Sequence, residues 1–188
     1  NYRTMKKIRH FLNLNELEKD EVELILSKSH DLKKNYGLKK FRKKKILAMI
    51  FEKPSTRTRV SFEVGMKQLD GDVVVLDQAD TQLGRGESIQ DTIKVLSRYV
   101  DIIMYRGSDE KKLYDLKKFS SIPIINGLTD SSHPCQILAD LMTLEEKFQS
   151  LNELNICWIG DGNNVCHSWI HASNHFNFNF NISCPDGC

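Results

Sequence analysis

The chain has 188 residues, of which 40% are hydrophobic and 28% are charged, and its formal net charge at pH 7 is +2. This composition is ordinary for a soluble globular protein, and the length is sufficient for a buried core in one or two domains. The small net charge indicates no particular partner. No apolar run approaches the length that crosses a bilayer, so we expect no membrane association.

The cysteines and the first residues bear on the cellular compartment. There are five cysteines, an odd number with no Cys-x-x-Cys pair, which favours a reducing compartment over a disulfide framework. Lys6, Lys7 and Arg9 are not followed by an apolar segment, so we expect no secretory signal peptide. Together these features predict a cytoplasmic protein.

The first predicted element is an amphipathic helix over residues 14–35, which Gly37 ends. A basic run follows, with eight Lys or Arg among the thirteen residues 33–45. Such a run is typical of a nucleic-acid patch and equally of a solvated loop. The acidic stretch 16–31 offsets it and no nucleic-acid-binding motif accompanies it, so we expect no nucleic-acid partner.

From residue 46 onward, short apolar runs alternate with helical patterns. Apolar strands separated by helices predict an α/β fold in which helices cover both faces of a parallel sheet. A domain boundary is expected near residues 149–153, after a long helix and before a new strand–loop–helix unit. The predicted strands are 46–51, 73–76, 102–105, 122–125, 154–159 and 176–183, and the predicted helices after the first are 56–69, 88–99, 110–119 and 133–147.

Polar chemistry follows four of these strands, at residues 55–59, 106–107, 126–136 and 160–164. Ligands of parallel α/β sheets bind at the carboxyl ends of the strands, so these segments are expected to converge on one cleft. Ser55–Arg59 lies where a strand passes into a helix N-terminus, and its hydroxyls and guanidinium groups suit a phosphate. The alternative is an ordinary capped helix with two solvated arginines.

His133-Pro-Cys-Gln136 is more specific, because Pro134 suits the first position of a helix and leaves His133 near the N-cap. An imidazole there can donate to a carbonyl oxygen, and the Gln136 carboxamide can bind an amide. Arg106 can likewise bind a carbonyl or phosphate oxygen. The alternatives are a capping histidine with an incidental glutamine, and a surface arginine.

Two further patterns are weak. Residues 160–165 match Gly-x-Gly but carry Val165 where a dinucleotide fingerprint needs a third small residue. His167, His171 and His175 share one helix face at i, i+4 and i+8, which could place two imidazoles on a metal. The third lies too far along and no acidic ligand accompanies them, so a half-exposed helix face is favoured. We predict no metal and no cofactor.

Four motifs together resemble the aspartate/ornithine carbamoyltransferase family, in order and in spacing: Ser-Thr-Arg-Thr-Arg at 55–59, the segment 91–101, Met-Tyr-Arg at 104–106 and His-Pro-Cys-Gln at 133–136. Within the family, Cys135 and the segments 83–88 and 160–164 favour the ornithine enzymes over the aspartate enzymes. The resemblance extends along essentially the whole chain. It implies a carbamoyl-phosphate-binding domain at 1–150 and the beginning of a Rossmann-like ornithine-binding domain at 151–188.

The resemblance also implies an activity, in which the carbamoyl group of carbamoyl phosphate passes to the side-chain amine of L-ornithine to give L-citrulline and phosphate. A homotrimer with shared active sites is expected. The phosphate is expected to bind Ser55, Thr56, Arg57 and Thr58, and Gln82 is expected to reach in from a neighbouring subunit. Arg106 and His133 are the expected catalytic residues, which hold the carbonyl oxygen, while Gln136 binds the amide nitrogen and Asn164 the ornithine backbone.

Most of the family's ornithine site is expected beyond residue 188, so the resemblance implies a truncated chain. We therefore expect this chain by itself to bind carbamoyl phosphate weakly or not at all and to turn over poorly. Two alternatives stay open. One is an aspartate or diamine carbamoyltransferase, and the other is a non-catalytic remnant that binds carbamoyl phosphate or forms trimers.

Overall fold

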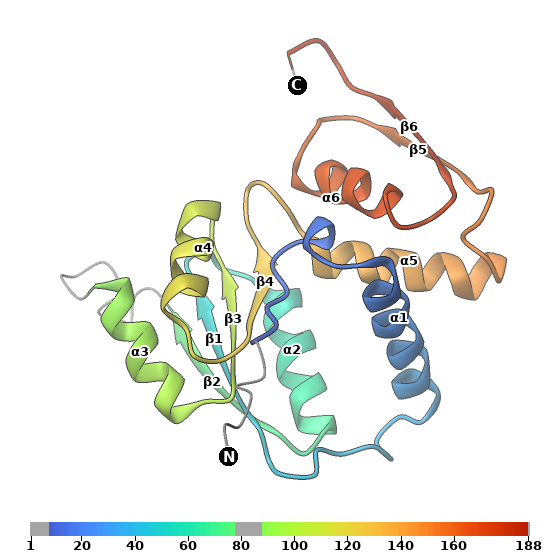
Figure 1. The fold of residues 1–188 in the computed structure, drawn as a ribbon. Coiled ribbons are helices and arrows are strands. Elements are labelled where there is room, and N and C mark those ends of the chain that lie inside the picture. The colour runs from blue at the N-terminus through green and yellow to red at the C-terminus, as the bar shows by residue number, and fades with distance from the viewer. Residues whose placement is uncertain (1–7, 78–87, 188) are drawn as a thin grey trace, which may run out of the picture.

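The computed structural model describes residues 8–77 and 88–187, which form alternating strands and helices (Figure 1). A short 3-10 helix, η1, precedes them at Leu14–Glu16. The strands are β1 (Ile46–Phe51), β2 (Asp72–Asp77), β3 (Ile102–Arg106), β4 (Ile124–Leu128), β5 (Asn155–Ile159) and β6 (Asn179–Ser183). The helices are α1 (Lys19–Lys34), α2 (Thr56–Gln68), α3 (Ile89–Tyr99), α4 (Glu110–Phe119), α5 (Pro134–Phe148) and α6 (Asn164–Ser173).

The first four strands form one parallel sheet in the order β2-β1-β3-β4. Figure 1 shows α3 and α4 on one face of this sheet and α2 on the other. The predicted α/β fold with a helix-covered parallel sheet is therefore confirmed. Because every strand is parallel, all four carboxyl ends lie at the same edge, and this geometry gathers the polar segments that follow them.

The apolar strand sequences explain why the sheet is buried on both faces. The alternate side chains of β1 enter two different clusters: Ala48 and Ile50 pack with α3 and α4, whereas Leu47 and Met49 pack with α2. All four are almost fully buried. Burial on both sides is the reason that a strand in such a sheet is a continuous apolar run rather than an alternating one.

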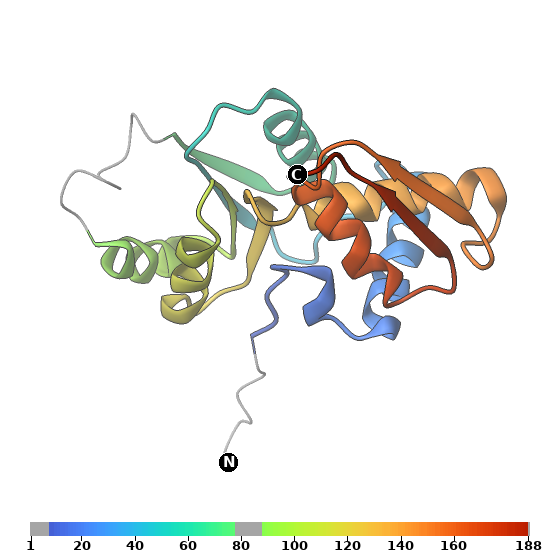
Figure 2. The same ribbon diagram turned by 90° about the horizontal axis from the view of Figure 1, so that it is seen from above.

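A second parallel pair, β5 and β6, forms its own sheet. A third apolar cluster holds this unit in place: Leu26 of α1, Leu141 of α5 and Trp169 of α6 pack together. Figure 2 shows the β5–α6–β6 unit beside α5, away from the four-stranded sheet. The β5–α6–β6 unit is therefore joined to the rest of the protein by the packing of α6 against α5.

The predicted helix over 14–35 is wrong at its start. The structure has the 3-10 helix at Leu14–Glu16, an extended residue at Leu17, and α1 only from Lys19. Leu14 is fully buried, and the Asn13 side chain accepts its backbone N–H at 2.9 Å. Packing of Leu14 against the third cluster thus overrides the helical periodicity.

The three histidines do not share one helix face, because α6 ends at Ser173 and His175 lies beyond it. Each binds a different segment: the imidazole of His167 contacts the Ser131 carbonyl, that of His171 the Asn13 side chain, and that of His175 donates to the Leu14 carbonyl. Over residues 8–77 and 88–187, no three His, Cys, Asp or Glu side chains are grouped as metal ligands.

Part of the basic run pairs with carboxylates of the same chain. Lys39 contacts Asp31, Lys44 contacts Asp72 at 2.8 Å, and Lys45 contacts Asp101 at 2.5 Å. These pairs fasten the loop before β1 to α1 and to the edge of the sheet. None of the helices described is both long enough and apolar enough to cross a lipid bilayer.

Candidate functional site

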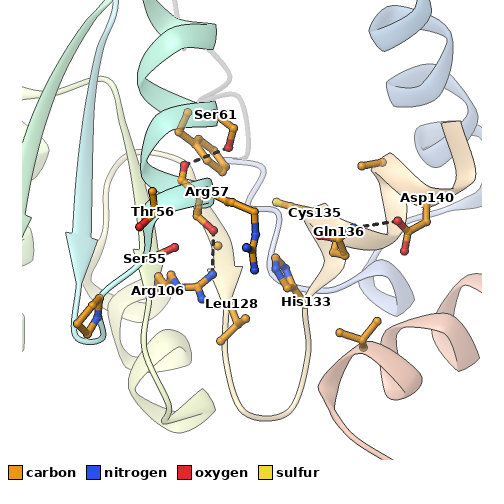
Figure 3. Close-up of a pocket in the computed structure, with 16 residues that line it drawn as sticks. Ser55, Thr56, Arg57, Ser61, Arg106, Leu128, His133, Cys135, Gln136 and Asp140 are labelled. Atoms are coloured by element: carbon orange, nitrogen blue, oxygen red, sulfur yellow. Dashed lines mark hydrogen bonds between the residues drawn. The ribbon is translucent and has the colours of Figure 1, made fainter. Parts of the chain in front are cut away.

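A cavity of about 770 Å³ lies at the carboxyl edge of the four-stranded sheet (Figure 3). Two helix N-termini and two strand ends contribute to its wall, from α2, α5, β3 and β4. Seven of the predicted site residues line it: Ser55, Thr56, Arg57, Thr58, Arg106, His133 and Gln136. Asp140 and Val165 also line the cavity, although no sequence motif indicated them as site residues.

The N-terminus of α2 forms one side of the cavity. Pro54 ends the extended chain after β1, and Ser55 is the N-cap residue, but its hydroxyl makes no capping hydrogen bond. The first N–H groups of an α-helix have no partner within the helix, and they carry the positive end of the helix dipole. The hydroxyl of Ser55 and these N–H groups are thus available to an anion.

Arg106 ends β3 and lies across the cavity from α2. Its Nη1 donates to Thr58 Oγ1 at 2.8 Å, whereas its buried Nε has no hydrogen-bond partner among the described residues. Burial, together with the neighbouring Arg57 charge, lowers the pKa of Arg106. Figure 3 shows the side chains of Arg57, Arg106 and His133 converging in the same part of the cavity.

The two arginines of the cavity have no carboxylate partner within the described chain. The salt bridges there include Arg9 with Glu21 and Arg59 with Asp77, but neither Arg57 nor Arg106. Two guanidinium groups that repel one another, one of them half-buried, carry an unfavourable electrostatic energy. An anionic ligand between them removes that cost.

His133 begins α5 and forms the opposite side of the cavity. Its backbone N–H donates to the hydroxyl of Ser168, a fully buried residue of α6, at 2.8 Å. Burial and the Arg106 charge lower the pKa of His133 to about 4, so the imidazole is neutral at pH 7. Its Nδ1 is buried without a partner in the described chain. A neutral imidazole in this position can donate one N–H to a carbonyl oxygen.

The loop that carries His133 is held by Asn126, a fully buried polar residue of β4. Asn126 Nδ2 donates to the Leu12 carbonyl at 2.9 Å and to Ser132 Oγ at 3.0 Å. The Cys135 thiol donates to the Asn126 carbonyl, and burial raises the pKa of this thiol to about 12. Cys135 is therefore a packing residue and not a nucleophile. Sequence reasoning missed the role of Asn126 in holding this loop. The signal that could have indicated it is the position of an asparagine directly after an apolar run.

A local irregularity in the sheet shapes the floor of the cavity. The pairing of β3 with β4 shifts between Tyr105 and Arg106, and Gly127 is left without a partner in β3. A Cβ at Gly127 would lie 2.4 Å from the sulfur of Met104 and 3.1 Å from the Tyr105 carbonyl oxygen, so a larger residue requires the Met104 side chain to move. Such bulges re-aim neighbouring side chains, here that of Arg106.

The remaining predicted residues lie elsewhere. Asn164 is not in the cavity wall, because its Nδ2 donates to the Thr129 carbonyl at 2.7 Å, and Val165 lines the cavity in its place. Gln82 and most of the segment 83–88 lie outside the described residues. Gln136 does line the cavity, and its Nε2 donates to Asp140 Oδ1 at 2.8 Å.

These features define a class of protein: an α/β protein with a cleft at the carboxyl edge of a parallel sheet, lined by two arginines and two helix N-termini. Residues 9–146 match the carbamoyl-P binding domain of aspartate/ornithine carbamoyltransferase, and residues 152–188 match its Asp/Orn binding domain. The chain belongs to the aspartate/ornithine carbamoyltransferase family. The resemblance drawn from the motifs is thereby confirmed.

Known relatives extend well beyond the length of this chain. The chain is 50% identical to an ornithine carbamoyltransferase of Rhodopseudomonas palustris strain BisA53 over 185 residues, covering 94% of this chain and 59% of the relative. A solved ornithine carbamoyltransferase from Pyrococcus furiosus superposes with a TM-score of 0.90 at 45% identity, covering 95% and 58%. A solved ornithine carbamoyltransferase from Burkholderia thailandensis superposes with a TM-score of 0.90 at 42% identity, covering 96% of this chain and 63% of that protein. The chain thus spans about 60% of the length of the relatives it matches.

Proposed function

We propose that the protein binds carbamoyl phosphate in this cavity and transfers the carbamoyl group to the side-chain amine of L-ornithine, giving L-citrulline and phosphate. The observation that carries the proposal is the pair of cavity arginines, neither of which has a carboxylate partner among residues 8–77 and 88–187, facing the helix start that holds His133 and Gln136. The name ornithine carbamoyltransferase, borne by the relatives and by the solved structures, supports ornithine over aspartate or a diamine.

The phosphate is placed at the N-terminus of α2. Ser55, Thr56 and Thr58 supply hydroxyls, the first turn supplies N–H groups, and Arg57 supplies a planar pair of donors. Thr58 uses an oxygen lone pair for Arg106, which leaves its own hydrogen free for the ligand. This set suits three phosphate oxygens.

The carbamoyl group is placed between β3 and α5. Arg106 and His133 bind the carbonyl oxygen, and Gln136 binds the amide nitrogen. Negative charge grows on that oxygen as the amine attacks, and on the phosphate as it leaves. Preorganised donors stabilise such a transition state by about 3–4 kcal/mol each. Since His133 is neutral, it acts as a hydrogen-bond donor and does not carry an additional proton at pH 7.

The amine must be neutral when it attacks. At an ordinary pKa of about 10.4, less than about one amine in a thousand is neutral at pH 7. Binding beside two guanidinium groups lowers the pKa of the bound amine, because neighbouring positive charges disfavour its cationic form. Holding the amine against the carbamoyl carbon also replaces a bimolecular encounter by an oriented one.

We further propose a homotrimer in which Gln82 enters the site of a neighbouring subunit. The outer face of α2 exposes Val60 and Val64, at 53% and 43%, next to the cavity wall, and this apolar surface supports a subunit contact there. Asn164 is proposed to turn from Thr129 toward ornithine when the acceptor binds. Light scattering of the purified protein tests the trimer, and a monomer contradicts it.

We propose residues 1–150 as the carbamoyl-phosphate domain and residues 151–188 as the start of the ornithine domain. The test uses the full gene product with carbamoyl phosphate and, in turn, ornithine, aspartate and putrescine. Citrulline from ornithine alone supports the proposal, whereas carbamoylation of aspartate or putrescine contradicts it. The 188-residue chain, assayed alongside, is expected to form little citrulline, and normal turnover by this chain would contradict the need for a larger acceptor site.

A further inference from the structure

Asp140 is the single acidic side chain in the described wall of the cavity. A carboxylate opposes the binding of a phosphate anion, so its presence in the same cavity wall as Arg57 and Arg106 calls for a physical reason. Asp140 forms no salt bridge within the described chain. Its recorded contact is with Gln136, one helical turn earlier on α5, whose Nε2 donates to Asp140 Oδ1 at 2.8 Å (Figure 3).

We propose that Asp140 is a positioning residue that fixes the Gln136 carboxamide with its oxygen toward the cavity, so that the site selects ligands with an N–H at the carbonyl carbon. The proposal rests on the proposed function, since it assumes a carbamoyl ligand in this cavity. It assigns Asp140 no contact with the ligand.

The chemistry of the two groups supports this role. A carboxamide has one face that donates and one that accepts, and it can rotate to present either. An ionised carboxylate can only accept, so it holds the Gln136 NH₂ group and leaves Oε1 for another partner. The pKa of Asp140 is raised: burial is the larger influence, and the Gln136 hydrogen bond only partly offsets it.

The consequence is selectivity between ligands of equal size. Carbamoyl phosphate and acetyl phosphate differ by NH₂ against CH₃, and only the first can donate to Gln136 Oε1. A site built to accept a hydrogen bond rejects the analogue that lacks the donor, because its own polar group is then left unpaired. Inorganic phosphate has no acyl group, so its Kd measures binding at the N-terminus of α2 without any contribution from Gln136.

The test compares Asp140→Asn with wild type in the full gene product at pH 8, by calorimetric titration of all three ligands. An asparagine can donate to Gln136 Oε1 and so turn the NH₂ group into the cavity. We expect the Kd for carbamoyl phosphate to rise about tenfold, equivalent to about 1.4 kcal/mol. The Kd values for acetyl phosphate and inorganic phosphate are expected to change less than about twofold.

Two controls separate positioning from charge and from folding. Glu146→Gln removes the same charge from the same helix at a surface pair with Lys33, and it is expected to leave all three Kd values unchanged. In a Gln136→Ala background, Asp140→Asn is expected to have no further effect on carbamoyl phosphate. An unaltered phosphate Kd shows that the variant has kept its fold.

Equal weakening of all three ligands by Asp140→Asn overturns the inference, since it indicates a charge or packing effect. Unchanged discrimination between carbamoyl and acetyl phosphate overturns it as well. If the wild type itself binds both acyl phosphates equally, the inference fails, whereas the proposed function fails only if no citrulline forms from ornithine. If the wild type and Asp140→Asn both prefer carbamoyl phosphate over acetyl phosphate to the same extent, only the inference is refuted and the proposed function stands.

Discussion

Arg106→Lys is the sharpest test of the catalytic geometry, because it keeps the charge at the end of β3 and removes only the planar fork. Arg106 offers Nη1 to Thr58 at 2.8 Å and keeps Nε and Nη2 for other partners. A lysine has one nitrogen on a flexible stem and cannot serve both Thr58 and a carbonyl oxygen with the same geometry.

The magnitude follows from which donor is lost. If the new ammonium keeps the Thr58 contact, one donor to the carbonyl oxygen disappears, which costs about 3–4 kcal/mol in the transition state. This corresponds to a fall in kcat of about 100- to 1,000-fold. Folding stability changes little, since Arg106 is only partly buried and makes no salt bridge among the described residues.

The assay is citrulline formation by the full gene product, with kcat and KM measured separately and thermal unfolding recorded beside them. Arg98→Lys is the matched control, since Arg98 is exposed in the last turn of α3 and outside the cavity wall. A kcat for Arg106→Lys within threefold of wild type would refute the assignment of Arg106 to the carbonyl oxygen.

Three further predictions follow from the same geometry. Arg57→Gly is expected to remove most turnover at a cost of about 1 kcal/mol or less in folding, and unchanged kinetics would place the phosphate elsewhere. The pKa of His133 is lowered to about 4 in the folded chain, against about 6.5 in the unfolded chain. Between these two pH values the unfolded chain therefore binds one proton more than the folded chain. The free energy of unfolding should therefore decrease as pH falls through that window, and the decrease should be smaller in His133→Gln. Thermal unfolding measures the dependence of stability on pH, and an equal dependence in the wild type and the variant contradicts this prediction. The raised pKa of Cys135 predicts that exposed Cys157 reacts first with iodoacetamide at pH 8, as peptide mass spectrometry can show, and early labelling of Cys135 contradicts the raised pKa.

Local sequence patterns were sufficient to predict the strands of the main sheet and their helix-covered, parallel arrangement. The apolar run 46–51 coincides with β1, and the other strands of the main sheet lie within a few residues of their predicted positions. Continuous apolar runs separated by helical periodicity admit few arrangements other than a covered parallel sheet. The position of the cleft followed from the same rule, because the loops after parallel strands all emerge at one edge.

The errors arose where long-range packing decides the local conformation. Leu14 leaves the expected helix because it is buried against α5 and α6, and His175 leaves the expected helix face because it donates to the carbonyl of that same Leu14. No periodicity within either segment contains this information.

Residue patterns along the chain were enough to predict the order of the strands and helices and the chemical types at each strand end. They also indicated the family, since the motifs at 55–59 and 133–136 combine residue types with a fixed spacing. The three-dimensional arrangement was needed for the rest: which cavity arginines lack a carboxylate among the described residues, that burial and Arg106 lower the pKa of His133, and that Gln136 donates to Asp140. Charge state and hydrogen-bond direction depend on burial and on neighbours distant in the sequence, and folding brings those neighbours within a few ångströms.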